Sequence, residues 1–129
     1  MASCDFHLHT TFSDGKKPIG DVLAMCSGEG LSIVSVTDHD DIRAASITSE
    51  GIHCITGIEL SSYYGEAEIH LLGYGYTSNN VLLQEITTTI RTERQARMQR
   101  MLMKAVHLKL IPDGDYTEEI YGDRVPGRS

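Results

Sequence analysis

Cys4-Asp5-Phe6-His7-Leu8-His9 is a stretch in which apolar and polar residues alternate, and this period of two predicts a β-strand. Residues i and i+2 of a strand project from the same face, so the His7 and His9 side chains can reach one cation together. Such a pair also occurs by chance on exposed strands. Its meaning therefore depends on what the following strands place beside it.

The chain that follows alternates helix-like and strand-like segments. A helix is expected from Pro18 to Gly28 or Gly30, because proline suits the first turn of a helix and glycine its end. The further strands expected from apolar and β-branched composition are 31–37, 52–60 and 66–73. Strands that alternate with helices predict a right-handed, parallel α/β arrangement.

Metal-binding residue types recur in or after each expected strand. These candidates are Asp14, Asp38, His39, Asp40, Glu59 and His70. Because the carboxyl ends of parallel strands meet on one face, where ligands bind, the pattern predicts a metal site there. Asp40 or Asp41 can instead cap a short helix that runs through Ile47.

Residues 78–110 predict one long amphipathic helix, capped by Asn79 or Asn80. Its apolar side consists of Val81, Leu83, Ile86, Ile90, Met98, Met101, Ala105 and Leu108. Arg94 and Arg97 fall on the same side, so each must meet a phosphate, pair with an acidic residue of the core or reach solvent. Pairing or solvent is favoured for Arg97, and the alternatives stay open for Arg94. A second short helix is expected at 116–120.

The composition is that of a single globular domain of 129 residues with a formal net charge of −7. Residues 1–77 hold eleven acidic and three basic residues, whereas 78–129 hold seven and eight. An acidic part that gathers histidines favours metal cations over duplex nucleic acid as partners.

No apolar run approaches the roughly 18 residues that span a bilayer, and no secretory signal is recognisable. Three widely spaced cysteines favour buried thiols in the reducing cytoplasm.

Several motifs occur here in an ordered combination: 5–10 with 13–15, 37–40, 57–61, 70–75, an arginine-rich helix and Gly127-Arg128. In this combination the chain resembles the PHP family, named for polymerase and histidinol phosphatase, and within it the small stand-alone metal-dependent phosphoesterases. The resemblance implies a distorted (β/α)7-type barrel that holds up to three divalent metal ions, usually manganese, iron or zinc.

The resemblance also implies roles by position. It assigns His7 and His9 to the first metal, Glu59 as a bridge to the second, His70 to the second, and Asp14 and His39 to the third. Asp38 is expected to orient a metal ligand, as metal-bound imidazoles usually require. The simpler interpretation of Asp40 is a helix cap. Arg128 and Arg94 are the candidates for contact with a substrate phosphate, whereas His53 and His107 lie outside the site.

Members of the family carry further histidine and aspartate ligands in a domain about twice this long. We therefore expect residues 1–77 to form the first four strands of the barrel core and 78–129 a helical segment that leads back to it, in a domain truncated at 129. Four strands cannot close such a barrel, so an exposed sheet edge, incomplete metal sites and weak activity are expected.

The function implied by the resemblance is metal-dependent hydrolysis of phosphate esters. Its substrates are small nucleotides of the nucleoside 3′,5′-bisphosphate type or the 5′ ends of short single-stranded RNA, in the cytoplasm. The alternatives are a histidinol-phosphatase-like enzyme and a non-catalytic PHP-like module for structure or interaction. Retention of every expected amino-terminal ligand favours an enzyme. Four tyrosines could stack on a nucleobase, although strand packing is favoured: Tyr63, Tyr64, Tyr74 and Tyr76.

Overall fold

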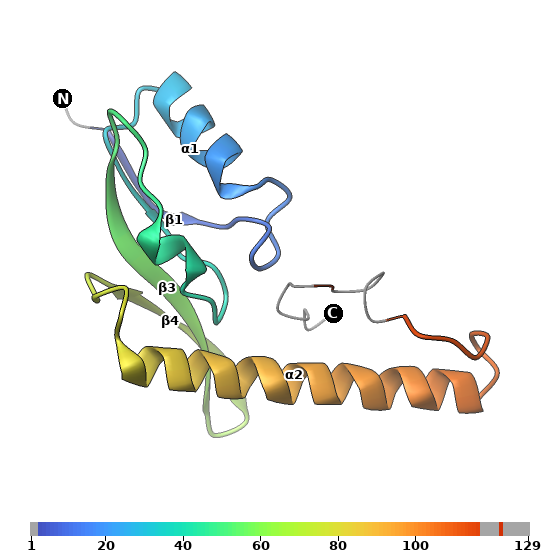
Figure 1. Cartoon of the computed structure of the whole chain (residues 1–129). Helices are drawn as coiled ribbons and strands as arrows, with labels where there is room; N and C mark the ends of the chain where they lie inside the picture. The colour runs from blue at the N-terminus through green and yellow to red at the C-terminus, as the bar shows by residue number, and fades with distance from the viewer. Residues whose placement is uncertain (1–2, 117–121, 123–129) are drawn as a thin grey trace.

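A computed structural model describes residues 3–116 and 122 of this chain. Its elements are β1 (Cys4–Leu8), α1 (Ile19–Gly28), β2 (Ile33–Val36), the 3₁₀ helix η1 (Arg43–Ser46), β3 (His53–Tyr64), β4 (Ala67–Tyr74) and α2 (Val81–His107) (Figure 1). The four expected strands and the two longer expected helices are present. The expected helix at 116–120 falls almost entirely outside the described residues. No helix in the described part is both long and apolar enough to cross a membrane.

The four strands form one curled sheet in the order β1-β2-β3-β4, which is a partial barrel. β1, β2 and β3 are parallel, as predicted, but β4 runs antiparallel to β3. The expectation of a wholly parallel sheet is therefore wrong at its last strand. Only Gly65 and Glu66 separate β3 from β4, and a parallel return needs a crossover of a dozen or more residues. Two residues allow only a hairpin, and β4 is left as an exposed edge.

The apolar core lies between α1 and one face of the parallel strands. Leu23 and Cys26 of α1 are buried against Val34 of β2 and against Ile52, just before β3. Pro18 precedes the helix, as predicted. All three cysteines are free thiols, but Cys4 is exposed, which corrects the expectation that all are buried. α1 thus covers one face of the sheet, and the residues after each strand remain available for a site.

The short helix after β2 differs from the expectation. It is the single 3₁₀ turn η1, and the backbone N–H of Arg43 donates to Asp41 Oδ1 over 2.8 Å. Asp41 therefore serves the start of this turn. Asp40 has a positive φ of 51° and a buried carboxylate that faces away to β3 and α2. The interpretation of Asp40 as a helix cap is wrong.

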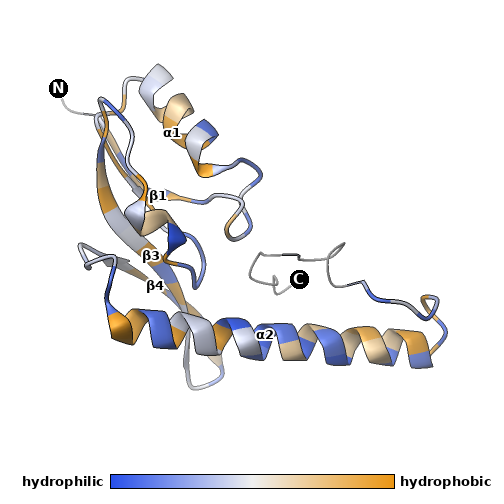
Figure 2. Ribbon diagram, in the orientation of Figure 1, coloured by the Kyte–Doolittle hydropathy of each residue, from blue (hydrophilic) through white to orange (hydrophobic). Residues whose placement is uncertain are grey.

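α2 begins as predicted, since the Asn80 side chain accepts a hydrogen bond from the Leu83 N–H. Its predicted apolar side is only partly covered by the described chain. The exposed members of that side are Val81, Ile86, Met101 and Leu108. Figures 1 and 2 show the reason: the helix extends well beyond the sheet, with apolar and polar residues interspersed along it. A periodic pattern predicts a helix, but burial also requires a neighbouring element.

The segment after β4 is hydrogen-bonded to β3 through Tyr76. Thr56 Oγ1 donates to the Tyr76 carbonyl over 2.6 Å, and the Tyr76 hydroxyl donates to the Gly57 carbonyl over 2.7 Å. Burial, reinforced by the negative charges of Asp41 and Asp38, raises the pKa of the Tyr76 phenol to about 12. The phenol is therefore held neutral in the folded chain.

The Tyr76 contact should make stability fall at high pH. An unfolded tyrosine ionises near pH 10, whereas folded Tyr76 keeps its proton to about pH 12. Its contribution is thus fully present below pH 10 and is lost as the pH rises through about 12. We expect the free energy of unfolding in urea to decline less steeply over this range in Tyr76→Phe than in the wild type. Tyr64→Phe, at a residue 81% exposed, is the control and should keep the wild-type slope. Equal slopes in all three proteins would contradict the assignment.

Candidate metal centre

Six predicted ligands from six separate places in the chain converge on one region. They form three groups in which the ligand atoms lie within 4.8 Å of one another: His7, His9 and Glu59; His9, Asp14 and His39; and His39, Glu59 and His70. His7 lies in β1, and His9 and His39 follow β1 and β2. Glu59 and His70 lie within β3 and β4. His53 and His107 belong to none of these groups.

Glu59 is the centre of this arrangement. Its Oε2 lies 3.0 Å from His7 Nε2, 3.1 Å from His9 Nε2 and 3.6 Å from His39 Nε2. Its Oε1 lies 2.7 Å from His70 Nδ1. The carboxylate, only 6% exposed, therefore has imidazoles on both of its oxygens, as a bridging ligand would require.

Asp14 extends the cluster on the side of the loop after β1. Its Oδ1 lies 3.3 Å from His9 Nδ1, and its Oδ2 lies 3.8 Å from His39 Nε2. His9 consequently presents one ring nitrogen to Glu59 and the other to Asp14. His39 faces both carboxylates through a single nitrogen. These shared residues join the three groups into one cluster.

His70 reaches the cluster in a way that the sequence did not predict. In the hairpin, His70 pairs with Ser61, two residues beyond Glu59. Residues two apart in β3 lie on the same face, so His70 comes from the middle of an antiparallel strand and not from the end of a parallel one. The predicted residue is in place, but the reason given for its position is corrected.

Burial and charge set the protonation states of the centre. Burial lowers the pKa of His39 below its ordinary value, which favours the neutral imidazole that a metal requires. Burial alone would raise the pKa of Glu59. Hydrogen bonding from His7, the positive charge that His39 carries while it is protonated, and hydrogen bonding from His70 together outweigh the effect of burial and leave the pKa of Glu59 below its usual value. The centre therefore combines an anionic carboxylate with a neutral imidazole.

The residues fit divalent metal ions. Bonds of about 2.0–2.2 Å to nitrogen and oxygen place neighbouring ligands of a tetrahedral ion roughly 3.3 Å apart. The donor pairs around Glu59 and Asp14 span 2.7–3.8 Å. His9 Nδ1 is a buried nitrogen that lies 3.3 Å from Asp14 Oδ1 but makes no hydrogen bond among the described residues. Imidazole and carboxylate ligands suit zinc, iron and manganese.

Asp38 holds the loop that carries two of the ligands. Its fully buried carboxylate accepts hydrogen bonds from the Thr10 N–H and Oγ1, both at 2.7 Å, and from Ser13 Oγ at 2.6 Å. The sequence predicts that Asp38 orients a metal ligand, and this role stays a prediction. Among the described residues the Asp38 carboxylate makes no hydrogen bond to a candidate ligand but holds the backbone between His9 and Asp14.

Gly15 closes the same loop tightly. Its N–H donates to the Thr10 carbonyl over 2.9 Å, and a Cβ added at this position would lie 2.5 Å from the carbonyl carbon and oxygen of His9. Only glycine allows these backbone segments to approach so closely. The Ser13-Asp14-Gly15 turn of the sequence thus sets the distance between Asp14 and His9.

Arg94 connects α2 to residues beside the metal centre. Its guanidinium donates to Asp40 Oδ2 and, over 2.8 Å, to Ser61 Oγ, while Asp40 Oδ1 accepts the Ser61 N–H over 2.8 Å. Of the alternatives weighed for Arg94, the structure shows the ion pair with an acidic residue of the core. Contact of Arg94 with a substrate phosphate stays a prediction, and Arg128 lies outside the described residues.

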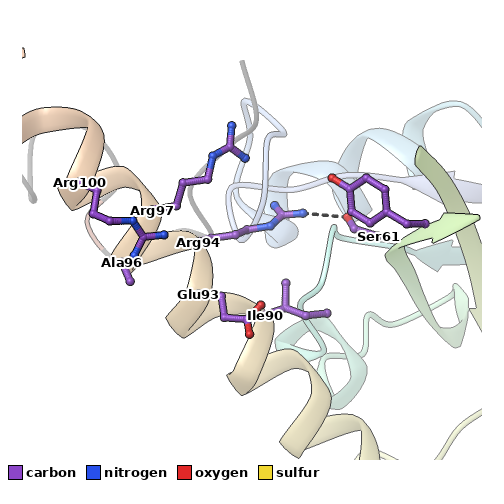
Figure 3. Close-up of a pocket in the computed structure, with 8 residues that line it drawn as sticks. Ser61, Ile90, Glu93, Arg94, Ala96, Arg97 and Arg100 are labelled. Atoms are coloured by element: carbon purple, nitrogen blue, oxygen red, sulfur yellow. Dashed lines mark hydrogen bonds between the residues drawn. The ribbon is translucent and has the colours of Figure 1, made fainter. Parts of the chain in front are cut away.

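A cavity of about 580 Å³ lies between β3 and α2, beside this ion pair. It is lined by Ser61, Tyr63, Ile90, Glu93, Arg94, Ala96, Arg97 and Arg100 (Figure 3). In the described part of the chain, neither Arg97 nor Arg100 has an ion pair. Tyr63 is 65% exposed and Tyr64 is 81% exposed, so strand packing is the wrong interpretation for both. Ser61, which lines this cavity, lies in the same strand as Glu59.

One contact of the centre was missed in the sequence. Glu68 Oε1 lies 2.8 Å from His70 Nε2, on the ring nitrogen that faces away from Glu59. Glu68 and His70 are two residues apart on one strand. The spacing that singles out His7 and His9 could therefore have identified this pair as well.

Comparison with known proteins gives consistent matches. A family model described as the PHP domain matches residues 5–127. A 3′,5′-nucleoside bisphosphate phosphatase from Chromobacterium violaceum is 28% identical over 78% of this chain and 37% of its own length. A 5′-3′ exoribonuclease from Haemophilus influenzae is 27% identical over 91% of this chain and 48% of its own length. The chain thus spans less than half the length of these relatives.

Solved structures share the fold. A structure described as a metal-dependent phosphoesterase from Bifidobacterium adolescentis superposes with a TM-score of 0.74 at 24% identity, over 88% of this chain and 41% of that one. An amidohydrolase from Chromobacterium violaceum gives a TM-score of 0.72 at 24% identity, over 91% and 42%. The predicted fold class, part of a barrel followed by a helix, is confirmed.

The close approach at Gly15 leads to a first test of the centre. In Gly15→Ala the added Cβ meets backbone, so the loop must move and carry Asp14 with it. We expect a loss of about 1–3 kcal/mol in stability, as for overpacking elsewhere, together with weaker zinc binding. Gly20→Ala, in the first turn of α1 with open space around it, is the matched control. Calorimetric titration with zinc should separate the two variants, and unchanged binding in Gly15→Ala would contradict the geometry.

The ion pair of Arg94 leads to a second test. Removing one partner of a buried pair costs about 3–5 kcal/mol, because the other charge stays buried. The Arg94 side chain is 13% exposed and that of Asp40 is 0% exposed. Arg94→Ala should therefore lower the free energy of unfolding, measured in urea, by an amount of that order. Arg97→Ala, three residues along the same helix at an exposed position, should leave it nearly unchanged. An equal loss of unfolding free energy in both variants would contradict the buried ion pair of Arg94.

Proposed function

The chain belongs to the PHP domain family, and from that premise we propose that it carries the metal-binding part of a metal-dependent phosphoesterase. The observation that carries this proposal is the buried Glu59 carboxylate, which four imidazoles face within 3.6 Å. A cluster of this composition suits divalent cations rather than nucleophilic side-chain chemistry. The names of the relatives support phosphate esters as the first substrates to test.

The residues that would hold the metals follow from the three groups. His7, His9 and Glu59 would hold one ion, and Glu59 would bridge to a second with His39 or His70. Asp14 with His39 and His9 would serve a third position. Manganese, iron and zinc are the candidates, and when bound they supply Lewis-acid chemistry for phosphate hydrolysis.

The protein side chains prepare this centre in three ways. Glu59 is held anionic and His39 neutral, so neither must give up a proton at neutral pH before binding. Asp38 fixes the loop of His9 and Asp14, which reduces the ordering needed when an ion binds. Arg94 and Asp40 hold α2 at the rim of the centre.

The arginine-lined cavity supports an anionic substrate. Arg97 and Arg100 line a space that continues from Ser61, and two-pronged guanidinium groups suit phosphate oxygens. Residues 1–77 carry few basic groups, so cationic contacts to phosphate must come from the metals and from the second part of the chain. We propose small nucleotides of the nucleoside 3′,5′-bisphosphate type, or short single-stranded RNA, as substrates. Arg128 is proposed as a further phosphate contact.

The decisive test is metal binding by the centre. Glu59→Gln keeps the shape of the side chain but removes the negative charge that four imidazoles face. We expect zinc or manganese affinity to fall at least about 10–100-fold, the loss typical even of partners that support a ligand. Glu50→Gln, at an exposed position, is the control. Wild-type affinity in Glu59→Gln, or no binding by the wild type, would contradict the proposal.

Stoichiometry and turnover extend the same test. The three groups share His9, His39 and Glu59, so these residues cannot supply three independent sites of three ligands each. Elemental analysis should therefore find fewer than three tightly held metals per 129-residue chain. Phosphate release from a nucleoside 3′,5′-bisphosphate should be slow and should stop on chelation. Three tightly bound metals would contradict the expectation of incomplete sites.

A further inference from the structure

The imidazole of His70 lies between two carboxylates, of which the proposed function uses only one. Its Nδ1 faces Glu59 Oε1 at 2.7 Å, and its Nε2 faces Glu68 Oε1 at 2.8 Å. Both distances are those of strong hydrogen bonds. Glu68 is absent from all three candidate metal groups of the described residues, so its contact with His70 needs a separate explanation.

The explanation follows from the chemistry of imidazole. In a neutral imidazole one ring nitrogen carries a proton and the other carries a lone pair. The nitrogen that donates its proton in a hydrogen bond leaves the other nitrogen free to bind a metal. The nitrogen that faces Glu59 belongs to a candidate metal group with His39. If Nδ1 offers its lone pair there, the proton must be on Nε2, where Glu68 accepts it.

The hairpin gives this contact a rigid base. Glu68 and His70 alternate with Ile69 on β4, so their side chains lie on one face of the strand. Glu68 pairs with Tyr63, and His70 pairs with Ser61, in a continuous register that runs from Gly57 to Tyr64. The two-residue turn fixes that register. The distance from Glu68 to the centre is thus set by the backbone.

We propose that Glu68 is a positioning residue of the metal centre, which accepts the Nε2–H of His70 and so presents Nδ1 as the ligand atom. The proposal rests on the proposed function. A carboxylate on the outer nitrogen also raises the basicity of the ligating nitrogen and holds the ring in one orientation. An isolated surface ion pair would contribute little, since the Glu68 and His70 side chains are 36% and 38% exposed.

The first experiment measures zinc affinity by competition with a chromophoric chelator. Glu68→Ala should weaken binding about 10–100-fold, the loss typical of residues that support a ligand. Glu68→Gln should lose less, because its amide oxygen still accepts the Nε2–H. Glu66→Ala, an exposed acid in the adjoining turn, is the matched control and should bind as the wild type does. Wild-type affinity in Glu68→Ala would overturn the proposal.

A double variant separates positioning from direct metal binding. A residue that acts only through His70 has no further effect once His70 is removed. Glu68→Ala in the His70→Ala background should therefore leave zinc affinity at the level of His70→Ala alone. An additional loss in the double variant would make Glu68 a ligand itself and would overturn the positioning role.

The second experiment needs no metal. Long-range proton–nitrogen NMR spectra of the metal-free protein report which ring nitrogen of His70 carries the proton. In the metal-free wild type Glu68 and Glu59 compete for this proton, so the Nε2–H form should be populated beside the Nδ1–H form, and Glu68→Ala should shift the ring toward the Nδ1–H form that Glu59 accepts. An unchanged His70 signal in Glu68→Ala would overturn the proposal. Wild-type protein that binds no zinc would instead overturn the proposed function, while the His70 signal would still report on Glu68.

Discussion

Glu59 is a carboxylate removed from water, and a buried charge is retained in a folded protein only where donors or cations face it. Here the four imidazoles come from three strands and the segments that directly follow them. His7 and His9 arrive on β1 and its end, His39 follows β2, and His70 arrives on β4. The packing of the sheet is thus arranged around one anionic group. The same demand explains why its pKa falls although burial alone would raise it.

A second set of buried acids supports this group without touching it. Asp38 fixes the loop after β1 through three short hydrogen bonds, and Asp40 joins β3 to α2 through Ser61 and Arg94. Each is fully or almost fully buried, so each depends on its partners. Two residues of one motif, on either side of His39 in the sequence, thereby hold different segments beside the centre.

The proposed phosphate ester chemistry would draw on two unlike parts of the chain. Residues 1–77 gather acids and histidines, which suit cations, and α2 brings arginines, which suit anions. The ion pair of Arg94 joins the two parts at the rim of the centre. Arg97 and Arg100 continue from there along the cavity.

The sequence by itself determined the strands, the two longer helices and the six candidate ligands. These depend on local periodicity, on caps such as Asn80 and on residue chemistry. Tertiary structure alone decided what those residues contact. The direction of β4 depended on β3 running beyond its predicted end to Tyr64, which leaves only a two-residue turn. The partners of Asp38 and Asp40 came from distant segments, and the outer face of α2 lacked a neighbour in the described chain. Glu68 acquires its role only because the hairpin register places His70 against Glu59, a distance that no local pattern specifies.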